Sequence, residues 1–208
     1  MEKVGPQGTL LFPLFNFDFT ESIPFDIRST PSRMGALTET ARTWPSSVRT
    51  GHPIYSFAAL GAQAQKFSGV DNRSGYSANS PFGMLHDMDG HIAIIDLPDQ
   101  HSMTFYHHVE EMHEVPYRYF KDFSGSYTDA AGQTSERTYS LFVRDVERGV
   151  VTSVTRMEER LWEKGLFFGQ RPGVGHGTRT ISARALFAEV SSVIKAGQAQ
   201  DYLYEIEK

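Results

Sequence analysis

One stretch decides the fold class of this chain: residues 91–111, HIAIIDLPDQHSMTFYHHVEE. The apolar run 91–97 predicts a buried strand. Ser102 or Thr104 can cap the segment that follows, so residues 102–114 predict a short helix at the end of that strand. In open α/β sheets, ligands bind in the crevice beyond the carboxyl ends of the strands. The stretch therefore predicts an α/β fold with a ligand site where the helix begins.

The helix predicted here groups side chains that suit general-base chemistry. Residues three and four apart share one face of a helix, which brings Glu110 and Glu111 within reach of His107 and places Thr104 one turn earlier. A carboxylate fixes the tautomer of a histidine and stabilises the imidazolium that forms when the ring takes a proton. The alternative is a polar, solvated helix face without chemistry. From spacing alone, both interpretations stay open.

The bulk composition is that of an ordinary globular domain. The chain has 208 residues, of which 39% are hydrophobic and 22% charged, which suits one domain over residues 1–208. The net charge of -5 argues against a nucleic-acid partner, because such proteins usually present a basic face. Without cysteine, the chain can form neither disulfides nor thiolate metal sites.

The ends and the hydropathy pattern suggest a location. No run of about 18 apolar residues occurs, so the sequence predicts no transmembrane helix and no membrane partner. The N-terminus, MEKVGP, does not resemble a signal peptide. We therefore expect a cytoplasmic protein.

Other stretches predict further helices and strands. Helix–turn–strand order before residue 91 is typical of α/β folds. The predicted elements are a strand in 9–15, a helix beginning near Thr30 and Pro31, a strand in 52–61, a short helix at 79–85, an aromatic-lined hairpin over 117–145, a short helix over 158–164, and a last helix over 182–195 capped by Ser182.

Two of these elements carry further candidate site residues. Ser32 and Arg33 fall in the first turn of the helix predicted from Thr30, where free N–H groups and a guanidinium favour an anion such as phosphate. The alternative is an ordinary cap with a surface arginine. Ser56 is a polar residue inside an apolar run, and His52 precedes a proline near the start of the second strand, where a structural role is the alternative.

Metal and serine chemistry receive little support. His108 and His113 are five residues apart and point away from one another on a helix, and the sequence has no HExxH motif. It also has no Gly-x-Ser-x-Gly elbow. Residues 173–177, GVGHG, lack the ending of a phosphate-binding loop and predict a flexible turn. We expect no metal site.

Several stretches together resemble one known family. They occur in order along the chain: GTLLFP at 8–13, TPSRMGALTE at 30–39, HPIYSFAALG at 52–61, SPFG at 80–83 and MTFYHHVE at 103–110. These resemble motifs of the aminoglycoside 3-N-acetyltransferases, the antibiotic N-acetyltransferase family. The resemblance implies a three-layer α/β/α sandwich around a mixed central sheet. It also implies acetyl-CoA as co-substrate and transfer of an acetyl group to an amine of an aminoglycoside or related amino sugar.

The resemblance also assigns roles to single residues. His107 matches the catalytic histidine of the family, Glu110 its carboxylate partner and Thr104 a hydroxyl that could stabilise the oxyanion. Ser32, Arg33 and Ser56 fall in motifs that line the CoA side, with His52 as a lesser candidate.

Two departures from the family pattern bear on activity. Met103 replaces an asparagine of the motif, and the family's usual N-terminal strand and helix have no counterpart before Gly8. The alternative function is therefore a remnant of the same fold that binds CoA poorly or acts as a binding protein. The particular amine, a resistance or a biosynthetic role, and the oligomeric state, a homodimer included, stay open.

Overall fold

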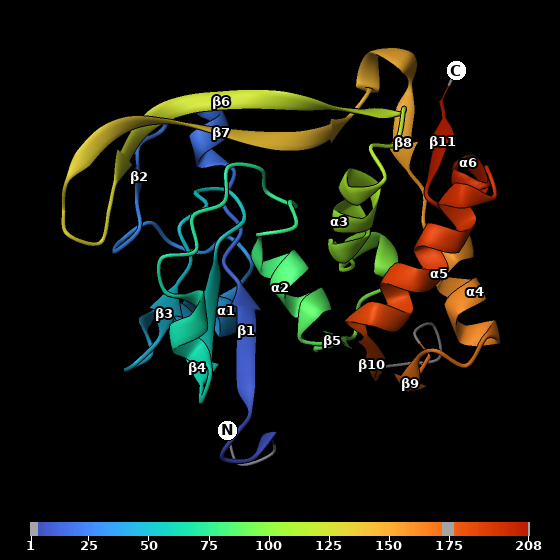
Figure 1. The fold of residues 1–208 in the computed structure, drawn as a ribbon, viewed down its shortest axis with the longest axis horizontal. Helices are drawn as coiled ribbons and strands as arrows, with labels where there is room; N and C mark the ends of the chain where they lie inside the picture. Colours follow the sequence, from blue (N-terminus) through green and yellow to red (C-terminus); the bar gives the residue numbers. More distant parts are fainter. Residues whose placement is uncertain (1–3, 172–176, 208) are drawn as a thin grey trace. The chain divides into compact units, whose positions relative to one another are not determined.

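The computed structural model of the protein describes residues 4–171 and 177–207, and it confirms the expected α/β class. Figure 1 shows helices and strands following one another along the chain. Two compact units divide the described residues between them. The first unit contains residues 4–75, 79–81 and 121–141, and the second contains residues 76–78, 82–120, 142–171 and 177–207.

An antiparallel sheet with the strand order β1-β4-β3 lies in the first unit. Its strands are β1 (Thr9–Pro13), β4 (Phe57–Gly61) and β3 (Val48–Arg49), and helix α1 (Ala36–Thr43) contacts β1 and β4. The apolar runs in 9–15 and 52–61, which were both expected to be strands, therefore form the neighbouring strands β1 and β4. The buried residues Leu14, Ala41 and Ala58 pack together with Phe12 and Leu60 and form the core between the helix and the sheet.

The aromatic hairpin is also confirmed. Strands β6 (Arg118–Thr128) and β7 (Thr134–Arg144) are neighbours in a sheet with the order β2-β6-β7. The turn between them is held by Asp129, whose Oδ1 accepts hydrogen bonds from the N–H groups of Ala131 and Gln133. Strand β2 (Phe25–Asp26) runs parallel to β6, with Phe25 opposite Tyr127, so the sheet is mixed.

The second unit contains two further sheets and most of the helices. Strands β5 (His91–Ile95), β10 (Thr178–Ser182) and β9 (Phe168–Gly169) form one sheet in the order β5-β10-β9, and β8 (Val150–Thr152) pairs with β11 (Tyr204–Ile206). Its helices are α3 (Phe105–Met112), α4 (Thr155–Glu163), α5 (Ala183–Lys195) and α6 (Ala199–Tyr202). It also contains α2 (Pro81–Asp87) except for its first residue. On α4, the ring of Trp162 packs against Phe167. Helix α5 contacts α3, α4 and α6.

Short 3₁₀ turns connect several of the described elements, and one more is given with the site below. They are η2 (Asp18–Glu21), η3 (Ala64–Phe67) and η5 (Val146–Arg148). The expected cap of the last helix is confirmed, because Ser182 Oγ accepts a hydrogen bond from the N–H of Ala185. Within the described ranges, no helix is both long and apolar enough to cross a membrane. The glycine-rich stretch 173–177 lies almost wholly outside the described residues.

Two sequence expectations about single elements are wrong. Strand β5 is not a buried strand: only Ile94 in it is buried, because β5 ends the sheet order and one of its faces is exposed. Helix α1 begins at Ala36 rather than near Thr30. Thr30 instead closes a turn, where its Oγ1 accepts from the N–H of Asp26, and Gly35 has a φ of 104° that a helix cannot include. The described strands also form four small sheets where one central sheet was expected.

Candidate active site

Helix α3 brings His107 and Glu110 together as the sequence predicts. The Nδ1 atom of His107 lies 2.7 Å from Oε2 of Glu110, one turn further along the helix. Of the two glutamates within reach of His107 by spacing, this contact selects Glu110. Thr104 immediately precedes α3, and its hydroxyl does not cap the helix. Ser102 does not cap it either, because its hydroxyl donates to the carbonyl of Pro98. The expected capping role of these two residues is therefore wrong.

Two residues that sequence reasoning missed hold the glutamate from the other side. Tyr117 donates its hydroxyl hydrogen to Oε1 of Glu110 at 2.9 Å. Arg118 forms an ion pair with Oε2 of Glu110 at 2.8 Å, and its side chain is only 6% exposed. Neither residue lies within a helical turn of Glu110 in sequence. Their position at the start of a strand after Pro116 gives no local signal of this contact.

Charge and burial together set the protonation of this pair. Burial lowers the pKa of His107, and the cation of Arg118 lowers it further, whereas Glu110 acts in the opposite direction. Burial would raise the pKa of Glu110, but Arg118 and the hydrogen bond with His107 outweigh it, so that pKa is lowered. At neutral pH the geometry therefore presents a neutral imidazole beside an ionised carboxylate.

A cavity of about 160 Å³ opens beside this pair, and His107 and Thr104 both line it. Its other lining residues come from the 3₁₀ turn η4 (Asp99–His101), from Ser102, Met103 and Tyr106, and from Thr152 and Val154. The side chain of His107 is 21% exposed, so its ring is accessible. The ring of Tyr76 lies edge-on to it at 5.4 Å between centroids. A partly exposed histidine, held by a carboxylate and facing a polar cavity, can exchange protons with a bound molecule.

A second buried network borders the same cavity. Asp99 accepts hydrogen bonds from Tyr106 at 2.5 Å and from Arg179 at 2.6 Å. Glu158 accepts from the N–H of Asp99 and lies 3.2 Å from Arg179. Burial raises the pKa of both Asp99 and Glu158. One arginine thus faces two carboxyl groups next to the cavity, an arrangement that no sequence spacing indicated, because Arg179 follows Asp99 by 80 residues.

Ser32 and Arg33, predicted to bind a cofactor, lie in the first unit on the loop before α1. They are not in the first turn of a helix, as the late start of α1 shows. The N–H of Ser32 donates to the carboxylate of Glu39, and its hydroxyl lies 2.8 Å from that of Thr38. The guanidinium of Arg33 is exposed and forms an ion pair with Asp18 at 3.0 Å. Arg33 therefore offers an accessible cation, while the N–H of Ser32 is already occupied by Glu39.

The other two candidates of the first unit, Ser56 and His52, are fully buried. Ser56 Oγ accepts hydrogen bonds from Arg49 at 3.1 and 3.2 Å, which accounts for a polar residue in an apolar run. His52 Nδ1 accepts from the N–H groups of Ile54 and Tyr55 at 3.2 and 3.0 Å. Burial lowers the pKa of His52 to about 3. These hydrogen bonds of Ser56 Oγ and His52 Nδ1 are thus made inside the first unit.

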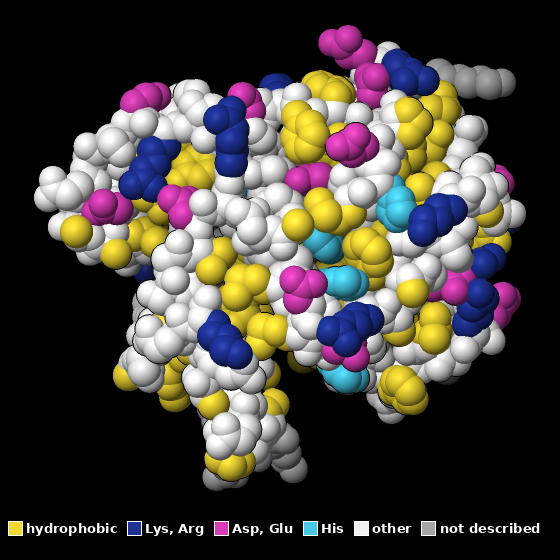
Figure 2. All heavy atoms as spheres, viewed as in Figure 1, with side chains coloured by type: hydrophobic (Ala, Val, Ile, Leu, Met, Phe, Trp, Pro, Cys, Tyr) yellow, Lys and Arg dark blue, Asp and Glu magenta, His cyan; other side chains and the backbone are white. Residues whose placement is uncertain are grey.

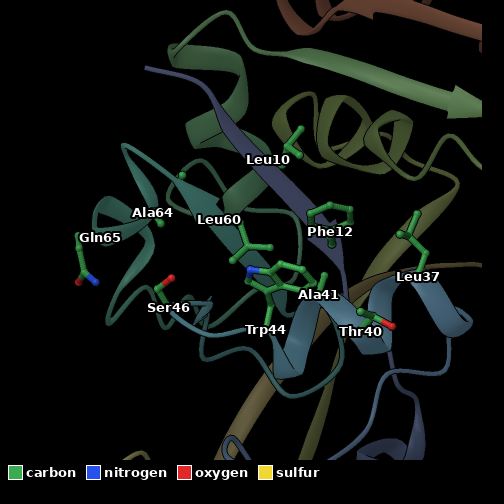
Figure 3. A pocket seen from close by; sticks show the side chains of 11 residues that line it. Leu10, Phe12, Leu37, Thr40, Ala41, Trp44, Ser46, Leu60, Ala64 and Gln65 are labelled. Carbon is green, nitrogen blue, oxygen red and sulfur yellow. The ribbon is translucent and has the colours of Figure 1, made fainter. Parts of the chain in front are cut away.

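A groove in the first unit is apolar, and its lining has no titratable side chain. Figure 3 shows it beside β1, β4 and α1, a groove of about 550 Å³ between Phe12, Leu60 and Trp44. Trp44 and Leu37 at this groove are more than half exposed. It offers surface for apolar contact but no group that could move a proton, so the polar cavity beside His107 is the candidate site for chemistry.

Among the described residues, His108 and His113 have partners other than a cluster of metal ligands. In the part of the chain that the structure describes, no group of three or more His, Cys, Asp or Glu side chains could hold a metal ion. His108 Nδ1 lies 2.6 Å from the carbonyl oxygen of Tyr76, and His113 Nε2 lies 2.8 Å from the hydroxyl of Ser191.

Figure 2 shows basic and acidic side chains interspersed over the face in view.

Comparison with known proteins identifies relatives along most of the chain. Residues 1–197 match the family model described as aminoglycoside 3-N-acetyltransferase. Aminoglycoside N(3)-acetyltransferase VII of Streptomyces paromomycinus is 35% identical over 91 residues, which are 43% of this chain and 31% of that protein. Aminoglycoside N(3)-acetyltransferase IX of Micromonospora chalcea is 29% identical over 135 residues, 55% of this chain and 48% of that protein. The matched stretches thus span about a third and about half of these curated relatives.

A solved structure shares the fold. AAC-IIIb, described as a binary complex with CoASH, superposes with a TM-score of 0.77 and 22% sequence identity over 93% of this chain and 79% of that one.

Proposed function

We propose that this chain, which belongs to the aminoglycoside 3-N-acetyltransferase family, transfers an acetyl group from acetyl-CoA to an amine of an aminoglycoside or related amino sugar. The observation that carries the proposal is the contact of 2.7 Å between His107 and Glu110 at the edge of a polar cavity. The named activity of two relatives and the CoASH in one solved structure support the same reaction.

His107 acts as the general base in this proposal. Glu110 holds the ring through Nδ1 and leaves Nε2 to take a proton. That proton comes from the substrate nitrogen as its bond to the acetyl carbon forms. His107 then returns the proton to the sulfur as the carbon–sulfur bond breaks, so the ring ends neutral. The lowered pKa of His107 keeps it free to accept a proton at neutral pH.

Thr104 is the candidate for stabilising the oxyanion. It lines the same cavity as His107, and its hydroxyl is not spent on capping α3. A hydroxyl donor within about 3 Å of the developing oxyanion would lower the barrier. Met103, which replaces a polar residue of the family motif, is buried and contributes no donor.

For the acyl donor, the residues of the first unit fit in part. Acetyl-CoA supplies the acetyl group as an activated thioester and carries phosphates. Arg33 fits a phosphate because its guanidinium is accessible and charged, and Ser32 adjoins it. Ser56 and His52 would act indirectly, because both side chains are fully buried: Ser56 accepts from Arg49, and His52 holds the backbone before β4. Arg33→Gln should therefore weaken CoA binding more than Ser56→Ala does.

A thiol-release assay tests the reaction. The purified chain is mixed with acetyl-CoA and a panel of amino sugars, with matched sugars lacking amines as substrate controls. We expect amine-dependent thiol release that is lost in His107→Gln. Equal rates in the native chain and in His107→Gln across the panel would overturn the proposal.

Calorimetry with CoA distinguishes the proposed acetyltransferase from the alternative function, a binding protein of the same fold. A cooperative melt with neither CoA binding nor thiol release would indicate a binding protein of the same fold without activity. CoA binding without turnover on any amine would place the defect in the chemistry rather than in the acyl-donor site.

A further inference from the structure

We propose that Arg118 is a positioning residue that keeps His107 neutral and controls which of its ring nitrogens carries the proton. This inference rests on the proposed role of His107 as general base. It adds a residue from strand β6 to the pair on helix α3.

Two charged groups meet at one nitrogen atom of His107. His107 Nδ1 lies 2.7 Å from Oε2 of Glu110 and 2.9 Å from Nη2 of Arg118. The Nε atom of Arg118 lies 2.8 Å from the same Oε2. The guanidinium is also anchored at its other end, where Nη1 donates to the carbonyl of Phe142 at 3.0 Å. Arg118 is therefore held in place, and it touches both partners of the candidate dyad.

The two contacts at Nδ1 exclude one another. Glu110 can bond only to a protonated Nδ1, because an ionised carboxylate is an acceptor. Arg118 can bond only to an unprotonated Nδ1, because a guanidinium is a donor without acceptor capacity. With the proton on Nδ1, Nε2 is free to act as the base; with the proton on Nε2, it is not. Arg118 thus competes with Glu110 over the tautomer that the reaction needs.

The same guanidinium prevents a resting imidazolium. A buried carboxylate alone would favour the protonated ring, which could not accept a further proton. Arg118 balances that carboxylate, because its positive charge, with Nη2 only 2.9 Å from Nδ1, repels the positive charge of an imidazolium. The charged ring is thereby destabilised, which favours return of the proton to the leaving sulfur.

The other groups facing His107 add smaller effects. Arg144 on β7 also lowers the pKa of His107, after burial and Arg118. Tyr76 contributes a neutral ring edge, and Tyr117 reaches His107 only through Glu110. On the cavity side, His101 and Asp99 line the same hollow. Arg118 is the cation that contacts the ring directly.

An NMR titration of the histidine ring signals tests the inference without any assay of activity. His107 is assigned among the eight histidines by comparison with His107→Gln. In the native chain we expect His107 to titrate below the ordinary histidine value of about 6.5, although it contacts a carboxylate. A midpoint above that value in the native chain would overturn the proposal, and this arm needs no variant at Arg118.

Three variants isolate the role of the guanidinium. Arg118→Gln should raise the midpoint of His107 by about one pH unit or more, the size of shift expected for a cation in direct contact. Arg118→Lys keeps the positive charge but loses the planar, two-pronged guanidinium. It should restore most of the native titration midpoint of His107. The matched control Arg148→Gln removes an exposed arginine and should leave the midpoint unchanged. An unchanged midpoint in a folded Arg118→Gln chain would overturn the proposal.

The pH profile of kcat/KM then separates positioning from mere structural support. We expect the acid limb of Arg118→Gln to move to higher pH together with the NMR midpoint. A lower rate with an unmoved limb would reduce Arg118 to a structural role and overturn the proposal. A shifted NMR midpoint in a chain that transfers no acetyl group would uphold the control of His107 while rejecting the proposed reaction.

Discussion

Two histidines, one in each unit, show how different partners at Nδ1 and different exposure separate a structural ring from a candidate base. His52 in the first unit is fully buried, and backbone N–H groups hold its Nδ1. His107 in the second unit keeps 21% of its side chain exposed, and charged side chains hold its Nδ1. Burial is the first cause of a lowered pKa for both rings.

The two rings differ in the partners of Nδ1 as well as in their exposure. Two backbone donors at Nδ1 fix His52 in the tautomer with hydrogen on Nε2, and nothing in that arrangement can change by moving a proton. At His107 a carboxylate and a guanidinium support opposite tautomers, and the ring faces a cavity. The comparison predicts that His52 serves stability and His107 serves reaction, and each experiment below can break that division.

The largest expected effect compares the two rings directly. His107→Gln should reduce acetyl transfer by about 10²- to 10⁴-fold, the usual contribution of a general base, with little change in Tm. His52→Asn, whose side-chain oxygen can replace Nδ1 as the acceptor, should keep most of the rate. Rates from the thiol-release assay and melts by circular dichroism provide the measurement. Equal loss of rate in both variants would contradict the division.

Next in size is the loss of the buried carboxylate. Glu110→Gln leaves Arg118 as a buried cation without its ion-pair partner, so we expect a loss of about 3 kcal/mol in the free energy of unfolding. Urea unfolding measures it. The exposed pair of Arg156 and Asp201 provides the control, and Asp201→Asn should cause no measurable change. A native-like stability of Glu110→Gln would show that Arg118 finds another partner.

Acid should reveal His52 through stability. Its pKa of about 3 in the folded chain lies below the unfolded value, so between pH 6.5 and 3 the unfolded chain binds the extra proton. Stability should therefore fall as the pH drops through this window, and His52 alone should account for about 2 kcal/mol lost by pH 5. His52→Asn should lose correspondingly less between pH 7 and pH 5 in urea titrations. Parallel losses in the two chains would contradict the assigned burial.

The smallest effect contrasts two threonines, one beside each histidine. Thr104→Val should reduce the rate about tenfold, or about 1.4 kcal/mol in the barrier, and leave stability nearly unchanged. Thr50 accepts the N–H of Phe57 within the buried core, so Thr50→Val should lower stability by about 1 kcal/mol and spare the rate. Thr104→Ser should restore activity. Retention of the full rate in Thr104→Val would remove Thr104 from the mechanism.

Local pattern predicted much of what the structure contains. Apolar runs located β1 and β4, and turn residues around Asp129 located the hairpin. Helical spacing on α3 predicted that His107 contacts Glu110 or Glu111, and the contact with Glu110 is made within that one helix. Such contacts depend only on residues that are close in sequence.

Contacts between distant residues escaped prediction. Arg118 and Tyr117 reach Glu110 because a strand begins beside α3, and Arg179 reaches Asp99 across 80 residues. The first turn expected around Ser32 failed for another reason. Gly35 adopts a positive φ, and Glu39 reaches back to the N–H of Ser32, so the helix starts later than its motif suggests.

The chain contains two tryptophans, and the units share them equally. Trp44 sits at the rim of the apolar groove in the first unit, more than half exposed, whereas Trp162 packs on Phe167 in the second. Each unit therefore carries its own intrinsic fluorophore. In Trp44→Phe the emission reports the second unit alone, and in Trp162→Phe the first, so one denaturant series on each variant compares the cooperativity of the two halves.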